Sequence, residues 1–340
     1  MAMQPRRLLQ LGLGLVLSAL FLYLALRDQD WGGIGSHLAA ADYRYVALML
    51  PLGVYGLYAR SQRWRLLLEA SNKRPVPILP VFSASAIGFM ANMILPLRVG
   101  EIARPLLAAR GAGLPVANTL ATVVLERVLD LVALATFGIG IVLVSDVPPE
   151  AARWARVAAV LAAAGFFGAI LVILRREQVV PVLDRLWVRI PRVGPILLEM
   201  EHEFLDGIAP IANPSVLLRA LAWSLWIWLV IAVSFALGFE AVGLGIPFLR
   251  GGITVSTIVA LAVAFPSAPG FVGTFEFGCR LALHDVLGAP ADLATGYALL
   301  VHATQFLTQV VMGVVFLARE GLRLGDLTGM GRSEGPQGPR

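Results

Sequence analysis

Six ionisable side chains lie in or beside a stretch of sequence that is otherwise apolar enough for the interior of a lipid bilayer. Each uncompensated charge costs roughly 2.5–3.5 kcal/mol in the centre of a membrane helix on insertion scales. We therefore expect these side chains to pair with one another, or to face water or a charged ligand. The six are Arg98, Glu101, Arg104, Glu126, Arg127 and Asp130.

Their types indicate recognition of a charged head group. Guanidinium groups match phosphate bidentately, and carboxylates balance that charge or accept a proton or an amine. Glu126 and Asp130 share a helix face, and Arg127 lies three residues before Asp130 and can pair with it. Arg60 and Arg63 also share a face, which either points inward or snorkels to the interface. Direct ligand contact and internal ion pairs between helices are equally good interpretations of this cluster.

The composition indicates a polytopic membrane protein. Of 340 residues, 58% are hydrophobic and 14% are charged, and the mean hydropathy is +0.79. The net charge of +5 does not indicate nucleic-acid binding, because the basic residues flank apolar runs as they do in cytoplasmic loops. The single cysteine, Cys279, excludes an intrachain disulfide and a cysteine-based metal site, and we expect no metal and no cofactor.

Eight hydrophobic segments predict an all-α fold with six full transmembrane helices and two broken or re-entrant helical hairpins; eight ordinary spans are the simpler alternative. The tryptophans of the fifth span are interpreted as an interfacial belt. Residues 1–320 form one domain, with 178–213 as amphipathic interfacial helices and 321–340 as a disordered cytoplasmic tail. Basic loops predict that both termini are cytoplasmic. The expected full spans are 8–26, 45–68, 115–144, 154–174, 217–239 and 293–317.

The two broken elements are interrupted by proline and glycine at comparable places in the two halves of the chain. We expect each chain segment to turn at membrane depth, where non-helical backbone is tolerated only beside a protein cavity. Matching interruptions are typical of repeat-built transporters with a site at the midplane, so an inverted repeat is our hypothesis. The expected hinge positions are Pro96, Gly100, Pro266, Pro269, Gly270 and Gly273.

Four ordered motifs carry a family resemblance: R-x-x-R-W-R at 60–65, N-x-x-x-P-x-R-x-G-E-x-x-R at 92–104, E-R-x-x-D at 126–130 and F-P-S-A-P-G-F-V-G-T-F-E at 265–276. Together they resemble the flippase-like family that includes the transmembrane region of lysylphosphatidylglycerol synthase, over roughly residues 8–317. The resemblance implies movement of a lipid with an anionic or zwitterionic head group between leaflets. We expect a stand-alone form without the fused aminoacyl-transferase. His302 stands where similar proteins often carry an arginine.

Three functions follow from these observations. The first is a flippase that moves a phospholipid or polyprenyl-phosphate lipid through a charged midplane cavity. The second is a non-transporting scaffold for a lipid-modifying or glycosyltransfer enzyme. The third, an intramembrane head-group enzyme, lacks H-E-x-x-H and G-x-S-x-G motifs, and none of the four histidines is placed beside the acidic clusters, so we expect no enzyme activity. The candidate head-group residues are Arg60, Arg63, Asn92, Arg98, Glu101, Arg104, Glu126, Arg127, Asp130 and Glu276.

The expected location is the cell (inner) membrane. The expected partners are membrane lipids with anionic or zwitterionic head groups, with a second copy of the chain and a separately encoded lipid-modifying enzyme as further candidates. The sequence has no Walker motif, so the energy for transport would come from a gradient or from downstream consumption of the lipid.

Overall fold

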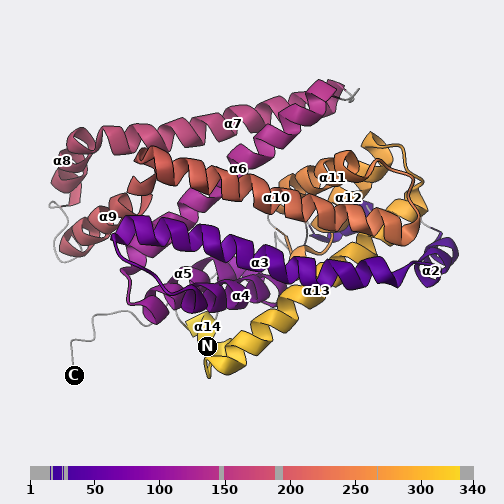
Figure 1. Ribbon diagram of the computed structural model, residues 1–340, viewed down its shortest axis with the longest axis horizontal. Helices are drawn as coiled ribbons and strands as arrows, with labels where there is room; N and C mark the ends of the chain where they lie inside the picture. Colours follow the sequence, from indigo (N-terminus) through magenta and orange to yellow (C-terminus); the bar gives the residue numbers. More distant parts are fainter. Residues whose placement is uncertain are drawn as a thin grey trace.

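The computed structural model describes residues 16, 18–24, 26, 30–144, 149–187, 194–265 and 267–329 (Figure 1). Over these residues every regular element is helical, which confirms the predicted all-α class. The span predicted at 8–26 lies mostly outside the described residues, as does the hinge position Pro266. Part of the predicted disordered tail at 321–340 is ordered: α14 (Leu324–Gly329) is helical because Leu327 is buried in one cluster with Leu106 and Phe316.

Five long helices form the frame, and each coincides with one of the predicted spans to within a few residues. Two of them are long and apolar enough, on the described residues, to cross a bilayer: α10 and α13 have mean hydropathies of 2.1 and 1.6. Local signals set their ends; for example, Asn213 caps the start of α10 and left-handed Gly243 ends it. The five are α3 (Tyr43–Asn72), α6 (Val116–Val144), α7 (Pro149–Leu174), α10 (Pro214–Val242) and α13 (Ala291–Arg319).

The element order repeats along the chain. In the first half α3 leads to the hairpin of α4 (Ile78–Ile94) and α5 (Val99–Ala112) and then to α6; in the second half α10 leads to α11 (Phe248–Val263) and α12 (Thr274–Arg280) and then to α13. The packing is reciprocal, because α4 packs on α13 and α11 packs on α6. The two hairpins lie toward opposite ends of the molecule (Figure 1). The inverted repeat itself stays a prediction.

The first hairpin turns between α4 and α5, as predicted, but glycine does not make the turn. Pro96 begins the 3-10 turn η1 (Pro96–Arg98), and Leu97 and Arg98 adopt left-handed backbone with φ of 62° and 51°. Gly100 lies inside the first turn of α5, where a Cβ would collide with the Gly88 carbonyl oxygen. Gly100 therefore acts through close helix packing and not as the predicted hinge.

The second hairpin also turns through a short 3-10 turn that begins with proline and contains residues with left-handed backbone. The 3-10 turn η3 (Pro269–Phe271) contains Gly270 at φ 71° and Phe271 at φ 59°, and Gly273 follows at φ 88°. These positive φ values explain why glycine stands at two of the predicted hinge positions. Left-handed backbone at non-glycine residues is strained and concentrates at functional sites, and here Leu97, Arg98 and Phe271 place it at the tips of both hairpins.

A peripheral segment joins the two halves. It follows the frame helix α7 and contains α8 (Arg176–Trp187), α9 (Gly194–Ile208) and the 3-10 turn η2 (Ala209–Ala212); α8 and α9 lie at the left of the molecule in Figure 1. Gly207 of α9 lies against Asn118 and Ala121 of α6, so close that a Cβ would be 2.5 Å from the Asn118 carbonyl oxygen. The helices predicted within 178–213 are thus present, and α9 is fixed to the frame.

Candidate functional site

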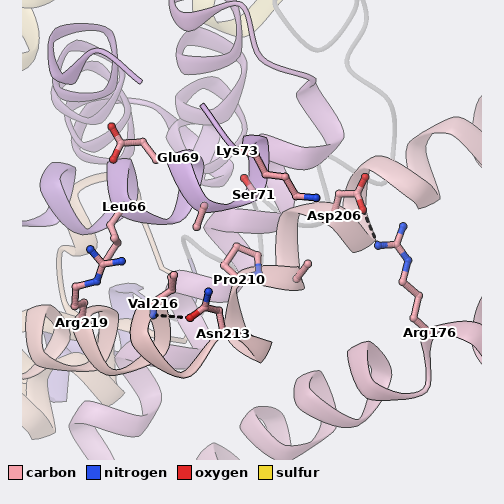
Figure 2. Close-up of a pocket in the computed structure, with 12 residues that line it drawn as sticks. Leu66, Glu69, Ser71, Lys73, Arg176, Asp206, Pro210, Asn213, Val216 and Arg219 are labelled. Carbon is pink, nitrogen blue, oxygen red and sulfur yellow. Dashed lines mark hydrogen bonds and ion pairs between the residues drawn. The ribbon is translucent and has the colours of Figure 1, made fainter. Parts of the chain in front are cut away.

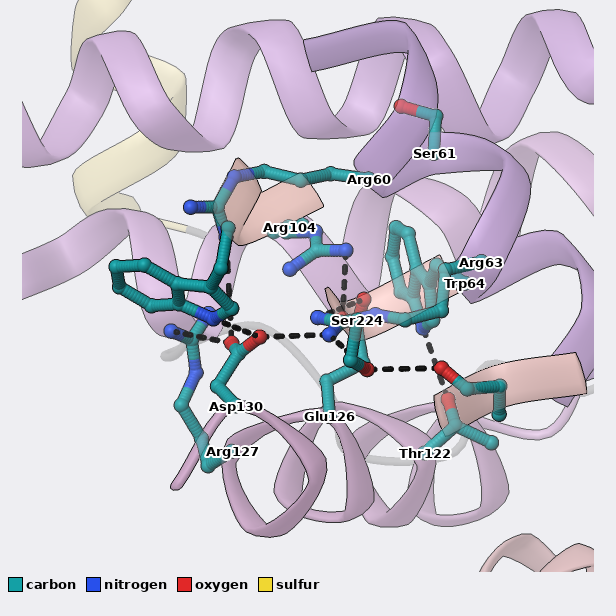
Figure 3. Close-up of polar contacts among 12 residues, drawn as sticks. Arg60, Ser61, Arg63, Trp64, Arg104, Thr122, Glu126, Arg127, Asp130 and Ser224 are labelled. Carbon is teal, nitrogen blue, oxygen red and sulfur yellow. Dashed lines mark hydrogen bonds and ion pairs between the residues drawn. The ribbon is translucent and has the colours of Figure 1, made fainter. Parts of the chain in front are cut away.

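Two carboxylates on α6 form a buried ion-pair network with arginines from α3 and α5 (Figure 3). Arg63 Nη1 donates to Asp130 Oδ1 at 2.6 Å, and its Nη2 donates to Glu126 Oε1 at 3.2 Å. Arg104 Nη2 lies 2.7 Å from the second oxygen of Glu126. All four residues are at most 5% exposed. Glu126 and Asp130 therefore share a face as predicted, and the network holds α3, α5 and α6 together.

Neutral side chains add further contacts to this network. The Arg104 guanidinium stacks 3.9 Å from the centre of the Trp64 ring. Trp228 Nε1 donates to Asp130 Oδ1 at 3.2 Å, and Ser224 accepts a bond from the α3 arginine at 2.8 Å. Such partners are needed because a buried ion pair is costly unless its donors and acceptors are satisfied. Trp228 is buried, so it does not belong to the predicted interfacial belt.

A cavity of about 650 Å³ lies beside the network, between the two halves of the chain. Helices α3, α4, α5, α6, α10, α11, α12 and α13 line it, together with both hairpin tips. Most of the lining is apolar, with Phe89, Leu134 and Phe235 among the larger side chains. The ionisable residues that line it are Arg60, Arg98, Glu101, Arg127, Asp130 and His302.

The arginines that face the cavity are held more loosely than those behind it. Arg60 Nη1 lies 4.0 Å from Asp130 Oδ2, and Arg127 Nη1 lies 3.7 Å from the same oxygen. Arg127 Nη2 lies 3.8 Å from Glu101 Oε2, and the Arg127 side chain is 43% exposed. The predicted Arg127–Asp130 pair thus forms, but as a long contact. The two carboxylate oxygens of Asp130 have different partners: Oδ1 binds the buried Arg63, whereas Oδ2 faces the two cavity arginines.

Arg98 lies where the two hairpin tips meet. Its Nη2 donates to the carbonyl oxygens of Val263 and Phe265, the second at 3.0 Å, and its guanidinium lies 5.5 Å from the centre of the Phe271 ring. These bonds satisfy carbonyl groups at the end of α11 that have no intrahelical partner. Arg98 therefore lines the cavity and also joins the first hairpin to the second.

Glu276 lies in the second hairpin and is bound to His302 of α13. Nδ1 of His302 is 2.5 Å from Glu276 Oε1, and its Nε2 is 2.7 Å from the Gly270 carbonyl oxygen. The Gly273 N–H donates to Glu276 Oε2 at 2.7 Å. The expectation that no histidine is placed beside the acidic clusters did not anticipate this contact between His302 and the candidate head-group residue Glu276. Glu276 and His302 lie 26 positions apart on two different helices, so no local sequence pattern could have indicated their contact.

The family model described as lysylphosphatidylglycerol synthase TM region matches residues 11–313. The chain belongs to this family. No curated protein and no solved structure matches it. The family is a membrane-protein family tied to phospholipid modification, and the match contains all four motifs and every residue of the network and the cavity.

In this family member the ten predicted head-group residues separate into layers. Arg63, Arg104 and Glu126 lie behind the cavity wall and pair with one another, and Glu276 reaches the cavity through His302. Asn92 lies at the lining, with Nδ2 3.5 Å from Glu101 Oε1. The remaining five form the ionisable lining: Arg60, Arg98, Glu101, Arg127 and Asp130.

A second pocket of about 640 Å³ lies at the end of α3, between η2 and the start of α10 (Figure 2). Its charged groups are partly paired: Arg176 Nη1 donates to Asp206 Oδ1 at 2.6 Å, and Glu69 Oε1 accepts from Arg65 Nε at 2.9 Å. The lining also includes Lys73. The predicted head-group residues all lie elsewhere, so this pocket is separate from the central cavity.

Proposed function

We propose that this protein is a lipid transporter that moves a lipid with a phosphate-bearing head group, of the phospholipid or polyprenyl-phosphate type, between the leaflets of the membrane. The observation that carries the proposal is the pair of loosely held arginines, Arg60 and Arg127, in a largely apolar cavity. A guanidinium binds phosphate through charge-assisted, bidentate hydrogen bonds, and these two have only long contacts to exchange for them. The chain transports the lipid without transforming it.

The charge balance favours an anionic ligand. The network and the ionisable lining hold five arginines against three carboxylates, with the Glu276–His302 pair set aside. A phosphate group that binds Arg60 and Arg127 replaces Asp130 Oδ2 as their partner. Asp130 stays compensated because its other oxygen keeps the bonds from Arg63 and Trp228. The same carboxylate then competes with the phosphate and favours its release.

The apolar surface at the edge of the cavity suits the lipid tail. Ile102 on α5 is 57% exposed next to the lining residue Glu101, and Leu131 on α6, which lines the cavity itself, is 38% exposed. An acyl or prenyl chain can therefore remain in the bilayer while the head group occupies the cavity. In this proposal six helices span the inner membrane, the two hairpins are re-entrant from opposite sides, and both termini are cytoplasmic. The opposed hairpins and their meeting tips support this topology.

Leaflet exchange in proteoliposomes tests the proposal. Fluorescent phospholipids and a fluorescent polyprenyl phosphate are compared with a fluorescent glycolipid that has no phosphate. The proposal predicts that the phosphate-bearing lipids exchange faster than in protein-free vesicles, whereas the neutral glycolipid does not. If no lipid exchanges faster than in protein-free vesicles, the transporter proposal fails and the non-transporting scaffold takes its place.

A further inference from the structure

The Glu276–His302 pair has a protonation state that its geometry fixes. Nε2 of His302 faces the Gly270 carbonyl oxygen at 2.7 Å, and a carbonyl oxygen only accepts, so Nε2 bears a hydrogen. Nδ1 faces Glu276 Oε1 at 2.5 Å. If Nδ1 were bare and the carboxylate ionised, two lone pairs would meet at this distance. The pair therefore holds one proton between Nδ1 and Oε1, carried either by the imidazolium or by the carboxylic acid.

This proton holds the tip of the second hairpin. His302 binds the Gly270 carbonyl of η3, Glu276 accepts from the Gly273 N–H, and the imidazole stacks on Phe275 with ring centres 4.4 Å apart. Phe271, between the two glycines in the chain, has a left-handed φ of 59° that side-chain-bearing residues disfavour, so the tip keeps its conformation through these bonds and not through the backbone preference of Phe271. Loss of the proton makes Nδ1 and Oε1 repel each other, and the bonds on both sides of the pair weaken.

The tip in turn contacts the first hairpin and the cavity. A Cβ on Gly270 would lie 3.2 Å from the Met93 carbonyl oxygen, and Arg98 covers the Phe271 ring. His302 itself lines the cavity, so a proton can reach Nδ1 or Oε1 from the side on which the head group binds. A movement of η3 therefore changes both the junction of the two hairpins and the cavity wall.

We propose that Glu276 and His302 form a proton-binding site that couples the position of the second hairpin's tip, and with it lipid transport, to a proton gradient. The inference rests on the proposed transport function and adds its source of energy. One proton enters the pair from the cavity and holds the tip closed. Its release opens the tip.

In the part of the chain that the structure describes, few other ionisable groups lie on the helices around the pair. On α12 the Cys279 thiol is buried, and Arg280 donates to the Leu24 carbonyl oxygen at 2.6 Å. On α13 the Tyr297 hydroxyl donates to the Phe235 carbonyl oxygen at 2.7 Å. α4 has no ionisable residue, and α11 and α10 have them only near their ends. The groups that face the pair across the cavity are Arg60, Arg98, Glu101, Arg127 and Asp130.

Hydrogen–deuterium exchange tests the switch without any lipid. Exchange of the segment 267–280 is measured on the full chain from about pH 5.5 to about pH 8.5, corrected for the intrinsic rate. The control is Glu276→Gln, whose Oε1 accepts from Gly273 and whose amide N–H donates to a bare Nδ1, so all the bonds persist without a titrating proton. We expect exchange to rise about tenfold with pH in the wild type and to stay flat in the variant. A flat wild-type profile, or the same rise in both proteins, overturns the inference.

Transport under an imposed pH gradient tests the coupling. The wild-type rate of lipid exchange should change when the gradient is reversed, and the Glu276→Gln rate should not. Wild-type exchange that ignores the gradient overturns the inference and leaves the proposed function intact. If hydrogen–deuterium exchange of the tip depends on pH but the protein exchanges no lipid, the proposed function and the coupling are both overturned, and the proton-binding site stands.

Discussion

The Arg98 guanidinium donates a 3.0 Å hydrogen bond to the carbonyl oxygen of Phe265, which lies 167 positions later in the sequence. This bond connects the first hairpin to the second. A second bond, to Val263, ends α11 in the same way that a basic residue caps a helix C-terminus. The central cavity is thus closed at one point by a contact between the two hairpin tips, both of which contain residues with left-handed backbone. Its geometry depends on both hairpins being in place.

Replacing Arg98 with Gln should loosen this junction. Hydrogen bonds from charged donors contribute roughly 1.5–3 kcal/mol, so we expect a lower melting temperature and faster amide exchange at 260–272. Arg98→Lys should restore part of the loss because it keeps the charge. The control is Arg44→Gln at an exposed pair with Asp42, where solvent screens the charges and the melting temperature should hardly change. Equal stability of Arg98→Gln and Arg44→Gln would contradict the bridging role.

Arg63→Gln should be far more damaging to folding than Arg60→Gln. Arg63 is 1% exposed and binds both Glu126 and Asp130, so its loss leaves two buried carboxylates poorly paired, at a cost of about 3–5 kcal/mol. Arg60 has one ion-pair contact, at 4.0 Å, and should give a folded protein. Thermal unfolding and size-exclusion chromatography of the two variants measure the difference. The layered description of the site is wrong if Arg60→Gln is the less stable of the two.

Gly100→Ala tests the packing of the first hairpin. A Cβ there would collide with the Gly88 carbonyl oxygen, so we expect a loss of roughly 1–3 kcal/mol. At Gly140, in the helical part of α6, an added Cβ would meet no atom within 4 Å, and Gly140→Ala should stabilise the protein by about 0.4–1 kcal/mol. Melting temperatures that shift in opposite directions support the packing assignment. If Gly100→Ala left the melting temperature unchanged, the packing assignment would be contradicted and the predicted hinge would again be the better interpretation of Gly100.

The sequence predicted the elements well because their signals are local. Apolar runs located the long helices, and proline and glycine located both broken hairpins. The charged motif at 126–130 also gave the shared face of Glu126 and Asp130 from helical spacing alone. These features depend only on residues a few positions apart.

Other parts of the site depend on distant contacts, and spacing could not reveal them. Nothing local indicated that Arg63 and Arg104 lie behind the cavity wall while Arg60 and Arg127 face it, because this division depends on how α3, α5 and α6 pack. The Glu276–His302 pair was missed for the same reason. Gly100 was assigned to a hinge because a glycine near a proline has the same signature whether it turns the chain or admits a neighbouring helix.

The most direct test of the central claim is leaflet exchange of a phosphate-bearing lipid by the double variant Arg60→Gln/Arg127→Gln. Its matched control is Arg44→Gln/Arg250→Gln, which removes the same charge from exposed positions outside the cavity. We predict that the cavity variant stays folded and loses at least about tenfold in exchange rate, whereas the control exchanges like the wild type. A folded cavity variant that exchanges the lipid as fast as the control would contradict head-group binding by Arg60 and Arg127.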